Sequence, residues 1–336
     1  ADLATVPKGL AGITKAHSAV NGTNWGFISL AICMMAGTAS LPHVMMRYFT
    51  TPSVKSARRS VAWSLLFIFI LYSTAPMLAT LSKLSLIDPT LSTGIIGKSI
   101  ADVQAIDWYQ NWNQANLMFV SDFNGNGTLE LNEFFMGGKA VVLATPEIAG
   151  LPYVISGLVA AGGMAAAMST ADGLVLAIAN ALSHDLYYKI IDPKAEAAKR
   201  LIVARVLLVL IGFAGATIAA MGIQGILGSV IWAFDFAMSG LFFPLVLGVW
   251  WKRANKQGAV AGMLLGLASG TAYLVWVRNG GAGFWGITQL TFGIVGSLVS
   301  LVSMVVVSLV TPAPDAKIQA MVDEVRIPSG RTVTGN

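Results

Sequence analysis

Charged residues are scarce in this chain, where only 11% of 336 residues are Asp, Glu, Lys or Arg. Soluble domains typically contain about 25% charged residues. The chain is also 55% hydrophobic, and its mean hydropathy is +0.71. This composition excludes an ordinary soluble domain and indicates an integral membrane protein.

Cysteine and histidine are nearly absent as well. The one cysteine, Cys33, lies in an apolar run, which excludes a disulfide framework and a thiolate metal cluster. The histidines are too far apart in the sequence to show the spacing of zinc ligands. Because no nucleophile–base pair or phosphate-binding loop is recognisable, an enzyme is the least supported class. The modest net charge of +5 follows membrane orientation, described below, and does not indicate a nucleic-acid partner.

Seven apolar stretches approach or exceed the roughly 20 residues that a helix needs to cross a bilayer. They cover residues 25–46, 60–82, 152–183, 201–221, 226–251, 257–277 and 285–310. We therefore expect an all-α integral membrane protein with about seven transmembrane helices. The expected order is an extracytoplasmic lead-in loop (1–22), two helices (23–82), an extracytoplasmic loop (83–147), five helices (148–310) and a cytoplasmic tail (311–336).

The basic residues give this order its orientation. They follow the first, third and fifth stretches and recur in the tail, so that fifteen of the 21 Lys and Arg residues lie on one side. Short basic loops remain in the cytoplasm. The C-terminus is therefore expected in the cytoplasm, and segment 83–147 on the opposite side.

Segment 83–147 contains DFNGNGTLELNE, which has the spacing of an EF-hand calcium loop. Its expected oxygen ligands are Asp122, Asn124, Asn126, Thr128 (through its carbonyl), Glu130 and Glu133. The alternative is an Asn/Gly-rich turn that binds no metal. Because two positions carry neutral Asn, we expect weak binding of a structural Ca²⁺, as in extracytoplasmic modules.

Polar side chains interrupt the third apolar stretch near its middle. Ser169 and Thr170 share a helix face with Ala166, and Asp172 lies three residues beyond Ser169. Such groups are costly in a bilayer unless they bind something, so they are candidate ligands of a cation. The alternatives are hydroxyls that bond back to carbonyls one turn earlier and helix–helix contacts. Asp172 could neutralise a second cation or proton, or pair with a basic residue.

Two other membrane segments carry candidate groups. In the first stretch, Gly37, Thr38 and Ser40 precede Pro42, a pattern suited to a locally unwound helix whose backbone faces a substrate. In the fifth, Asp235 is a second intramembrane carboxylate. It could be functional, or it could pair with an Arg or bond to a broken helix near Gly240.

Four motifs in this order resemble the sodium:solute symporter family. They are GTASLPHVMMRYFT (37–50), TPEIAGLP (145–152), AAAMSTADGLVLAIANALSHDLYY (165–188) and LFFPLVLGVWWKRANKQGAVAGMLLG (241–266). The third resembles the ion-site helix of the family, and the first its substrate-site helix. The likeness is greatest to the bacterial acetate/monocarboxylate permease branch.

The resemblance implies a five-plus-five inverted repeat of the leucine-transporter type, with a sodium site between the first and eighth core helices. Carried over, Ala166 would supply its carbonyl, and Ser169 and Thr170 their hydroxyls. The first five spans would be core helices six to ten, and the last two additional helices. We therefore expect the N-terminal half of the transporter, with the remaining ligands, to be missing from this chain.

The leading hypothesis is a symporter of the bacterial inner membrane. Sodium would drive the uptake of a small organic solute, a short-chain monocarboxylate such as acetate. The alternatives are another solute, such as an amino acid or sugar, and a membrane sensor or receptor module built on a symporter-like fold.

Overall fold

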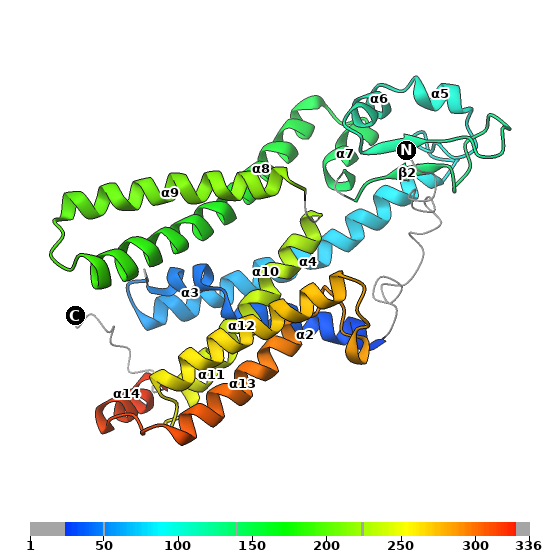
Figure 1. The fold of residues 1–336 in the computed structure, drawn as a ribbon. Helices are drawn as coiled ribbons and strands as arrows, with labels where there is room; N and C mark the ends of the chain where they lie inside the picture. The colour runs from blue at the N-terminus through cyan, green and yellow to red at the C-terminus, as the bar shows by residue number, and fades with distance from the viewer. Residues whose placement is uncertain (1–23, 50, 139, 223–224, 327–336) are drawn as a thin grey trace. The chain divides into compact units, whose positions relative to one another are not determined.

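The computed structural model describes residues 24–49, 51–138, 140–222 and 225–326. The expected lead-in loop, 1–22, lies outside the described residues, as does the end of the expected tail, 327–336. The chain divides into two compact units, Ala1–Ala16 with Arg59–Thr170, and His17–Arg58 with Ala171–Asn336. Each unit is described by itself, with the element labels of Figure 1.

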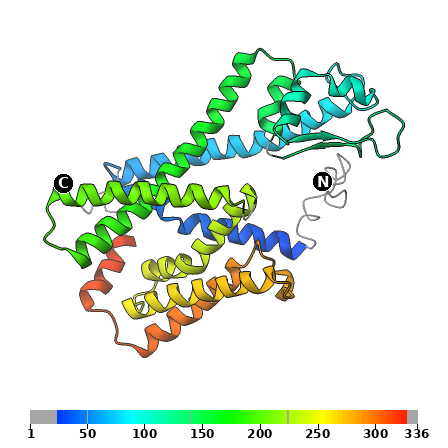
Figure 2. The same cartoon turned by 45° about the horizontal axis from the view of Figure 1, so that its top comes forward.

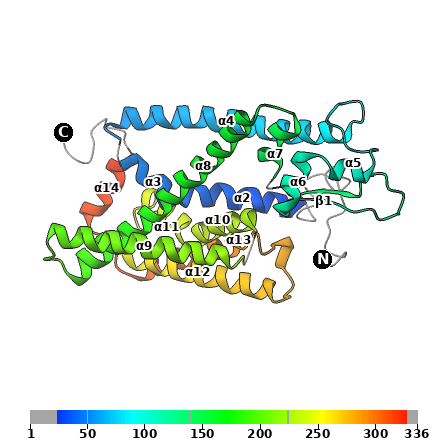
Figure 3. The ribbon, with the colours of Figure 1, turned by 90° about the horizontal axis from the view of Figure 1, so that it is seen from above.

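The first unit contains two long helices joined by short elements. The long helices are α4 (Val54–Ile87), apart from its first turns, and α8 (Tyr153–Asn180) as far as Thr170. The short elements are α5 (Ile100–Gln104), α6 (Asp107–Gln114), β1 (Met118–Val120), β2 (Phe134–Met136) and α7 (Val141–Ile148). Figure 3 shows α4 leading directly into this group.

Residues 83–148, from the end of α4 to the end of α7, have a packed core of their own, and we name them the linking subdomain. Its largest fully buried apolar side chains are Leu86, Ile95, Val103, Met118, Leu129 and Phe134. Strands β1 and β2 pair in antiparallel fashion, with Met118 opposite Met136. The segment that the sequence suggested to be a polar loop is thus a small subdomain. Its apolar residues are far apart in the sequence, but they pack together in one core.

The second unit contains the remaining helices. They are α2 (Asn24–Ser40), α3 (Pro42–Phe49), η3 (Ala181–Ile191), α9 (Ala197–Ala220), α10 (Ile226–Ala237), η4 (Met238–Phe242), α11 (Phe243–Trp250), α12 (Lys256–Arg278), η5 (Phe284–Gly286), α13 (Gly293–Val310) and α14 (Ala316–Arg326). Segments η3 and η4 are π-helical turns that continue α8 and join α10 to α11.

Six helical segments of the described chain are long and apolar enough to cross a membrane. They are Val54–Ile87, Tyr153–Ile191, Ala197–Ala220, Ile226–Trp250, Lys256–Arg278 and Gly293–Val310. A seventh apolar helix, Trp25–Ser40, is shorter. The expected all-α membrane fold is confirmed, and many large apolar side chains of these helices, such as Phe67, Phe69 and Phe213, are exposed.

The first expected span is shorter than the sequence suggested. Helix α2 ends at Ser40, and α3 begins at Pro42 after the non-helical Leu41. Proline lacks a backbone N–H and disfavours the helical conformation of the residue before it, so the helix breaks there. The break lies where an unwound helix was expected, although Gly37–Ser40 are themselves helical.

Helices α12 and α13 lie side by side (Figure 2). Four buried glycines at every fourth position of α12 face α13 and η4: Gly258, Gly262, Gly266 and Gly270. A Cβ added to Gly262 would lie 3.0 Å from the Ser300 carbonyl oxygen and 3.1 Å from Met304 Cβ. The glycine stripe therefore lets the two backbones approach, as small residues do in membrane helices. We call this contact the glycine seam.

Candidate functional site

The expected ion-site residues occupy consecutive turns of α8. The Thr170 hydroxyl donates a hydrogen bond to the Ala166 carbonyl oxygen at 3.3 Å, so these two oxygens lie together. Ala166, Ser169, Thr170 and Asp172 are all exposed. The long back-bond is the simple structural alternative that the sequence left open. The sodium assignment stays a prediction.

The expected substrate residues of α2 play different parts. Thr38 is exposed, and its hydroxyl donates to the Met34 carbonyl oxygen at 2.6 Å. Ser40 is fully buried and donates to the Ala36 carbonyl oxygen at 2.6 Å. Gly37 is a close-packing position, because a Cβ there would lie 2.6 Å from Phe234 Cβ on α10. Of the three, Thr38 is the one whose side chain lies at a surface, and the substrate assignment stays a prediction.

Asp235 on α10 is enclosed by three helices. It is 0% exposed, and among the described residues no hydrogen bond reaches either carboxylate oxygen within ordinary geometric limits. Polar groups close to it include the thiol of Cys33 on α2 and the backbone N–H groups of Phe292 and Gly293, where α13 begins. Gly293 permits this approach, since a Cβ there would lie 3.0 Å from Asp235 Oδ1.

The structure therefore differs from both simple interpretations of Asp235. No ion pair joins it to an Arg within the described part of the chain. Its polar neighbours are also not the carbonyls of the broken helix near Gly240. The start of α13 and Cys33 were not predicted as its surroundings. An intramembrane carboxylate signals such a site, but the sequence does not show which segments surround it.

The loop with calcium-loop spacing lies between the strands of a β-hairpin, whereas an EF-hand loop is flanked by helices. Asp122 accepts hydrogen bonds from the N–H groups of Gly125, at 2.7 Å, and Gly127, at 3.0 Å. The buried Glu133 carboxylate accepts from the N–H groups of Phe123 and Glu130, both at 2.9 Å. These bonds hold the loop in its observed conformation.

The asparagines of the same loop direct their amide nitrogens inward. Asn124 Nδ2 and Asn126 Nδ2 each donate to Glu130 Oε1 at 3.0 Å. The backbone N–H of Thr128 bonds to Asn126 Oδ1 at 2.7 Å. Within the described residues no cluster of three or more His, Cys, Asp or Glu side chains suits a metal. The geometry does not support calcium, which stays a prediction.

The motif TPEIAGLP has a structural role at the entrance to α8. The Thr145 hydroxyl lies 2.8 Å from that of Ser82 and joins α7 to α4. Glu147 Oε2 accepts a hydrogen bond of 3.0 Å from Trp112 Nε1. The motif thereby fixes the linking subdomain at the point where the chain enters the candidate ion-site helix.

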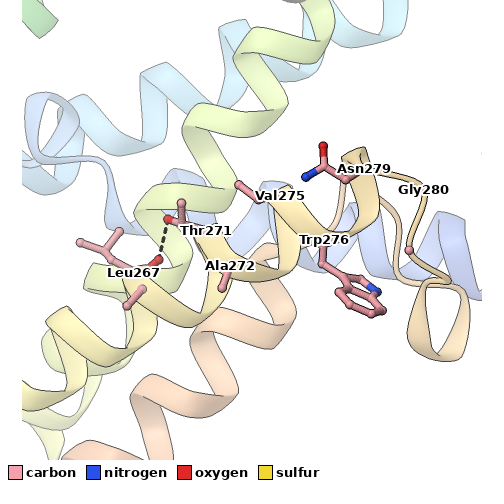
Figure 4. Close-up of a pocket in the computed structure, with 9 residues that line it drawn as sticks. Leu267, Thr271, Ala272, Val275, Trp276, Asn279 and Gly280 are labelled. Atoms are coloured by element: carbon pink, nitrogen blue, oxygen red, sulfur yellow. Dashed lines mark hydrogen bonds between the residues drawn. The ribbon is translucent and has the colours of Figure 1, made fainter.

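An open groove on the outer face of α12 is a weaker candidate site (Figure 4). It runs past Leu267, Thr271 and Trp276 to the turn at Gly280. The Thr271 hydroxyl donates to the Leu267 carbonyl oxygen at 2.6 Å, and no charged residue lines the groove. An apolar surface of this kind suits lipid better than a polar solute.

Six long apolar helical segments in the described residues define the chain as a multi-pass α-helical membrane protein. Residues 139–266 match the model of the sodium:solute symporter family. This match includes the candidate ion-site helix and Asp235, so this part of the chain is similar to the sodium:solute symporter family.

Two curated relatives are similar over most of the chain. An uncharacterized symporter of Cupriavidus necator is 39% identical over 310 residues, which are 89% of this chain and 44% of the relative. A monocarboxylic acid transporter of Corynebacterium glutamicum is 27% identical over 255 residues, 75% of this chain and 39% of the relative. The chain thus spans less than half the length of either relative.

Proposed function

We propose that this chain forms part of a sodium-coupled symporter for a small organic solute, with a short-chain monocarboxylate such as acetate as its substrate class. The observation that carries this proposal is the family match over residues 139–266, which includes the hydroxyl pair of α8. The substrate class is supported by the similarity to the monocarboxylic acid transporter.

Sodium binds, in this proposal, at the face formed by Ala166, Ser169 and Thr170. A sodium ion prefers several oxygen ligands, and this face offers one carbonyl and two hydroxyls on adjacent turns. The distance of 3.3 Å between the Thr170 hydroxyl and the Ala166 carbonyl oxygen is compatible with a bond that yields to an ion. Asp172 lies one turn further along α8 and lowers the electrostatic cost of bringing a cation to this depth.

The orientation follows from the basic loops. The loop after η3 is held by an ion pair of 3.0 Å between Lys199 and Asp192, and this hydrogen bond lowers the pKa of the Asp192 carboxyl. The Arg200 guanidinium lies 3.5 Å from the centre of the Tyr188 ring. Such basic and aromatic clusters suit a cytoplasmic membrane interface. The proposal therefore places α14 in the cytoplasm and the protein in a bacterial inner membrane.

The test is solute uptake by liposomes that contain the natural protein. We expect uptake of labelled acetate to require sodium. Thr170→Ala should raise the sodium concentration for half-maximal uptake about tenfold, the equivalent of about 1.4 kcal/mol for one lost ligand. Thr170→Ser, which keeps the hydroxyl, should restore it.

The matched control is Thr217→Ala on α9. The Thr217 hydroxyl bonds to the Phe213 carbonyl oxygen at 2.8 Å, in the same four-residue pattern. We expect its loss to leave the sodium dependence unchanged. If Thr170→Ala also leaves it unchanged, the proposed sodium site is wrong.

A further inference from the structure

Asp235 is the one carboxylate among the described residues that is fully buried in a membrane-spanning helix. Both its oxygens lack a well-formed hydrogen bond. Leaving an ionised carboxylate in such a place costs several kcal/mol unless it is paired, so burial favours the protonated acid.

The groups that surround Asp235 favour the opposite form. The Cys33 thiol and the N–H groups of Phe292 and Gly293 are hydrogen-bond donors close to the carboxylate, although none of them completes a well-formed hydrogen bond to it. Phe292 and Gly293 also begin the 18-residue helix α13, whose positive dipole end stabilises a nearby negative charge. Burial and donors thus act against each other, which makes both protonation states accessible.

The neighbouring elements supply little other charge. The elements packed against α10 are α2, η4, α12 and α13, and α12 carries their only basic side chains in the described residues. The Arg278 guanidinium lies 5.4 Å from the centre of the Trp232 ring. Trp232 precedes Asp235 by about one turn of α10. Tyr273 donates its hydroxyl proton to the Ile287 carbonyl oxygen at 3.0 Å, and Lys256 lies at the opposite end of α12.

The identity of the ligand follows from the neighbouring atoms. A metal cation needs several oxygen ligands, whereas the groups nearest Asp235 are N–H and S–H donors, which repel a cation. We propose that Asp235 is a proton-binding site, and that its ionisation holds α2 and the start of α13 against α10. The proton comes from a hydronium ion in water, binds one carboxylate oxygen and returns to water when Asp235 ionises.

The local structure allows this change to have an effect. The π-helical turn η4 begins three residues after Asp235, and such turns are frequent at functional sites. Gly37, four residues beyond Cys33, packs directly on Phe234. Protonation removes the charge that attracts the donors of α2 and α13, so α2 is held less tightly. Any link between this proton and solute transport rests on the proposed symport, but the proton site itself does not.

The native Cys33 provides a test that needs no transport. The experiment measures the rate at which a small neutral maleimide alkylates Cys33. The rate is compared between the natural protein and Asp235→Asn, in membranes, from about pH 5 to pH 9. An ionised Asp235 attracts the thiol proton of Cys33 and holds α2 against α10, so the thiol reacts slowly. The rate in the natural protein divided by the rate in Asp235→Asn should be close to one at low pH and fall about tenfold at high pH.

Asp107→Asn is the matched control, because Asp107 on α6 is exposed and lies outside the proposed sodium and proton sites. Its ratio should stay close to one at every pH. A ratio for Asp235→Asn that does not change with pH would overturn the proposal. If that variant does not fold, infrared spectra of the natural protein with isotope-labelled Asp give the answer. A carboxylic-acid band that disappears at high pH supports the site, and a pH-independent spectrum overturns it.

Discussion

The glycine seam and the linking subdomain pack by opposite means. The seam brings the backbones of α12 and α13 together through glycines such as Gly262 and Gly266, whereas the linking subdomain fills its centre with large side chains such as Phe134, Met118 and Leu86. Burying apolar side chains stabilises a fold in water. In lipid that gain disappears, and close contact between helices takes its place. The packing of the glycine seam is therefore of the kind expected in lipid, and that of the linking subdomain is of the kind expected in water.

The largest effect should follow from a side chain placed in the glycine seam. In Gly266→Leu, the new side chain would meet Ser300 Cβ, 2.8 Å from the position of an added Cβ, and the backbone of η4. Overpacking of this kind costs 1–3 kcal/mol or more, and backbone cannot move aside as a side chain can. We expect loss of the folded protein, measured by thermal unfolding in detergent micelles.

The control for this variant is Gly212→Leu on α9, where an added Cβ meets no atom within 4 Å. It should behave like the natural protein. Equal stability of the two variants would show that the glycine stripe of α12 does not determine packing.

A strong effect confined to the linking subdomain should follow from Phe134→Ala. Phe134 is 0% exposed, and its truncation should cost about 3–5 kcal/mol. Hydrogen exchange measured by mass spectrometry in nanodiscs should increase over residues 83–148 and remain unchanged in α12 and α13.

Phe135→Ala gives the matched comparison within β2. Phe135 is half-buried and stacks on Phe119 with ring centres 5.7 Å apart, a contact worth about 0.5–1.5 kcal/mol. Exchange should rise only slightly. If Phe134→Ala also accelerates exchange throughout the membrane helices, the two regions do not fold as separate units.

Calcium should have the smallest effect, confined to the linking subdomain. If the loop binds it with an affinity near 1 mM, as extracytoplasmic modules do, 10 mM calcium would stabilise the subdomain by about 1.4 kcal/mol. The measurement is hydrogen exchange over residues 118–136 with and without calcium.

Glu133→Gln should remove the calcium-dependent part of this protection. The variant also weakens the bonds to the Phe123 and Glu130 N–H groups, so the comparison is made between calcium and calcium-free samples of each protein. No change in the natural protein up to 10 mM calcium would exclude the metal.

Much of the fold and part of the site could be predicted from the sequence. The apolar stretches predicted the long helices, since hydropathy is a local property, and Pro42 marked the break after α2. The hydroxyls of Ser169 and Thr170 were identified as an ion-site candidate by their helical spacing. Helix α8 contributes one face of such a site. No further ligand was identified among the described residues, so the sodium site stays a prediction from the sequence.

The calcium loop shows why a local pattern is insufficient. The spacing from Asp122 to Glu133 is that of a calcium loop, but the strands β1 and β2 on either side turn it into the end of a hairpin. Whether its carboxylates face a metal or the backbone N–H groups depends on those flanking strands. The same holds for TPEIAGLP, whose Glu147 finds its partner Trp112 through tertiary packing.

The sequence by itself determined that this is a membrane protein similar to the sodium:solute symporter family, because composition, hydropathy and motifs are read directly along the chain. Only the tertiary structure decided where Asp235 lies. Its neighbours Cys33 and Gly293 come from helices distant in the chain, and no periodicity within α10 reports on them. A buried charge is governed by what surrounds it, and that is a property of the packed fold.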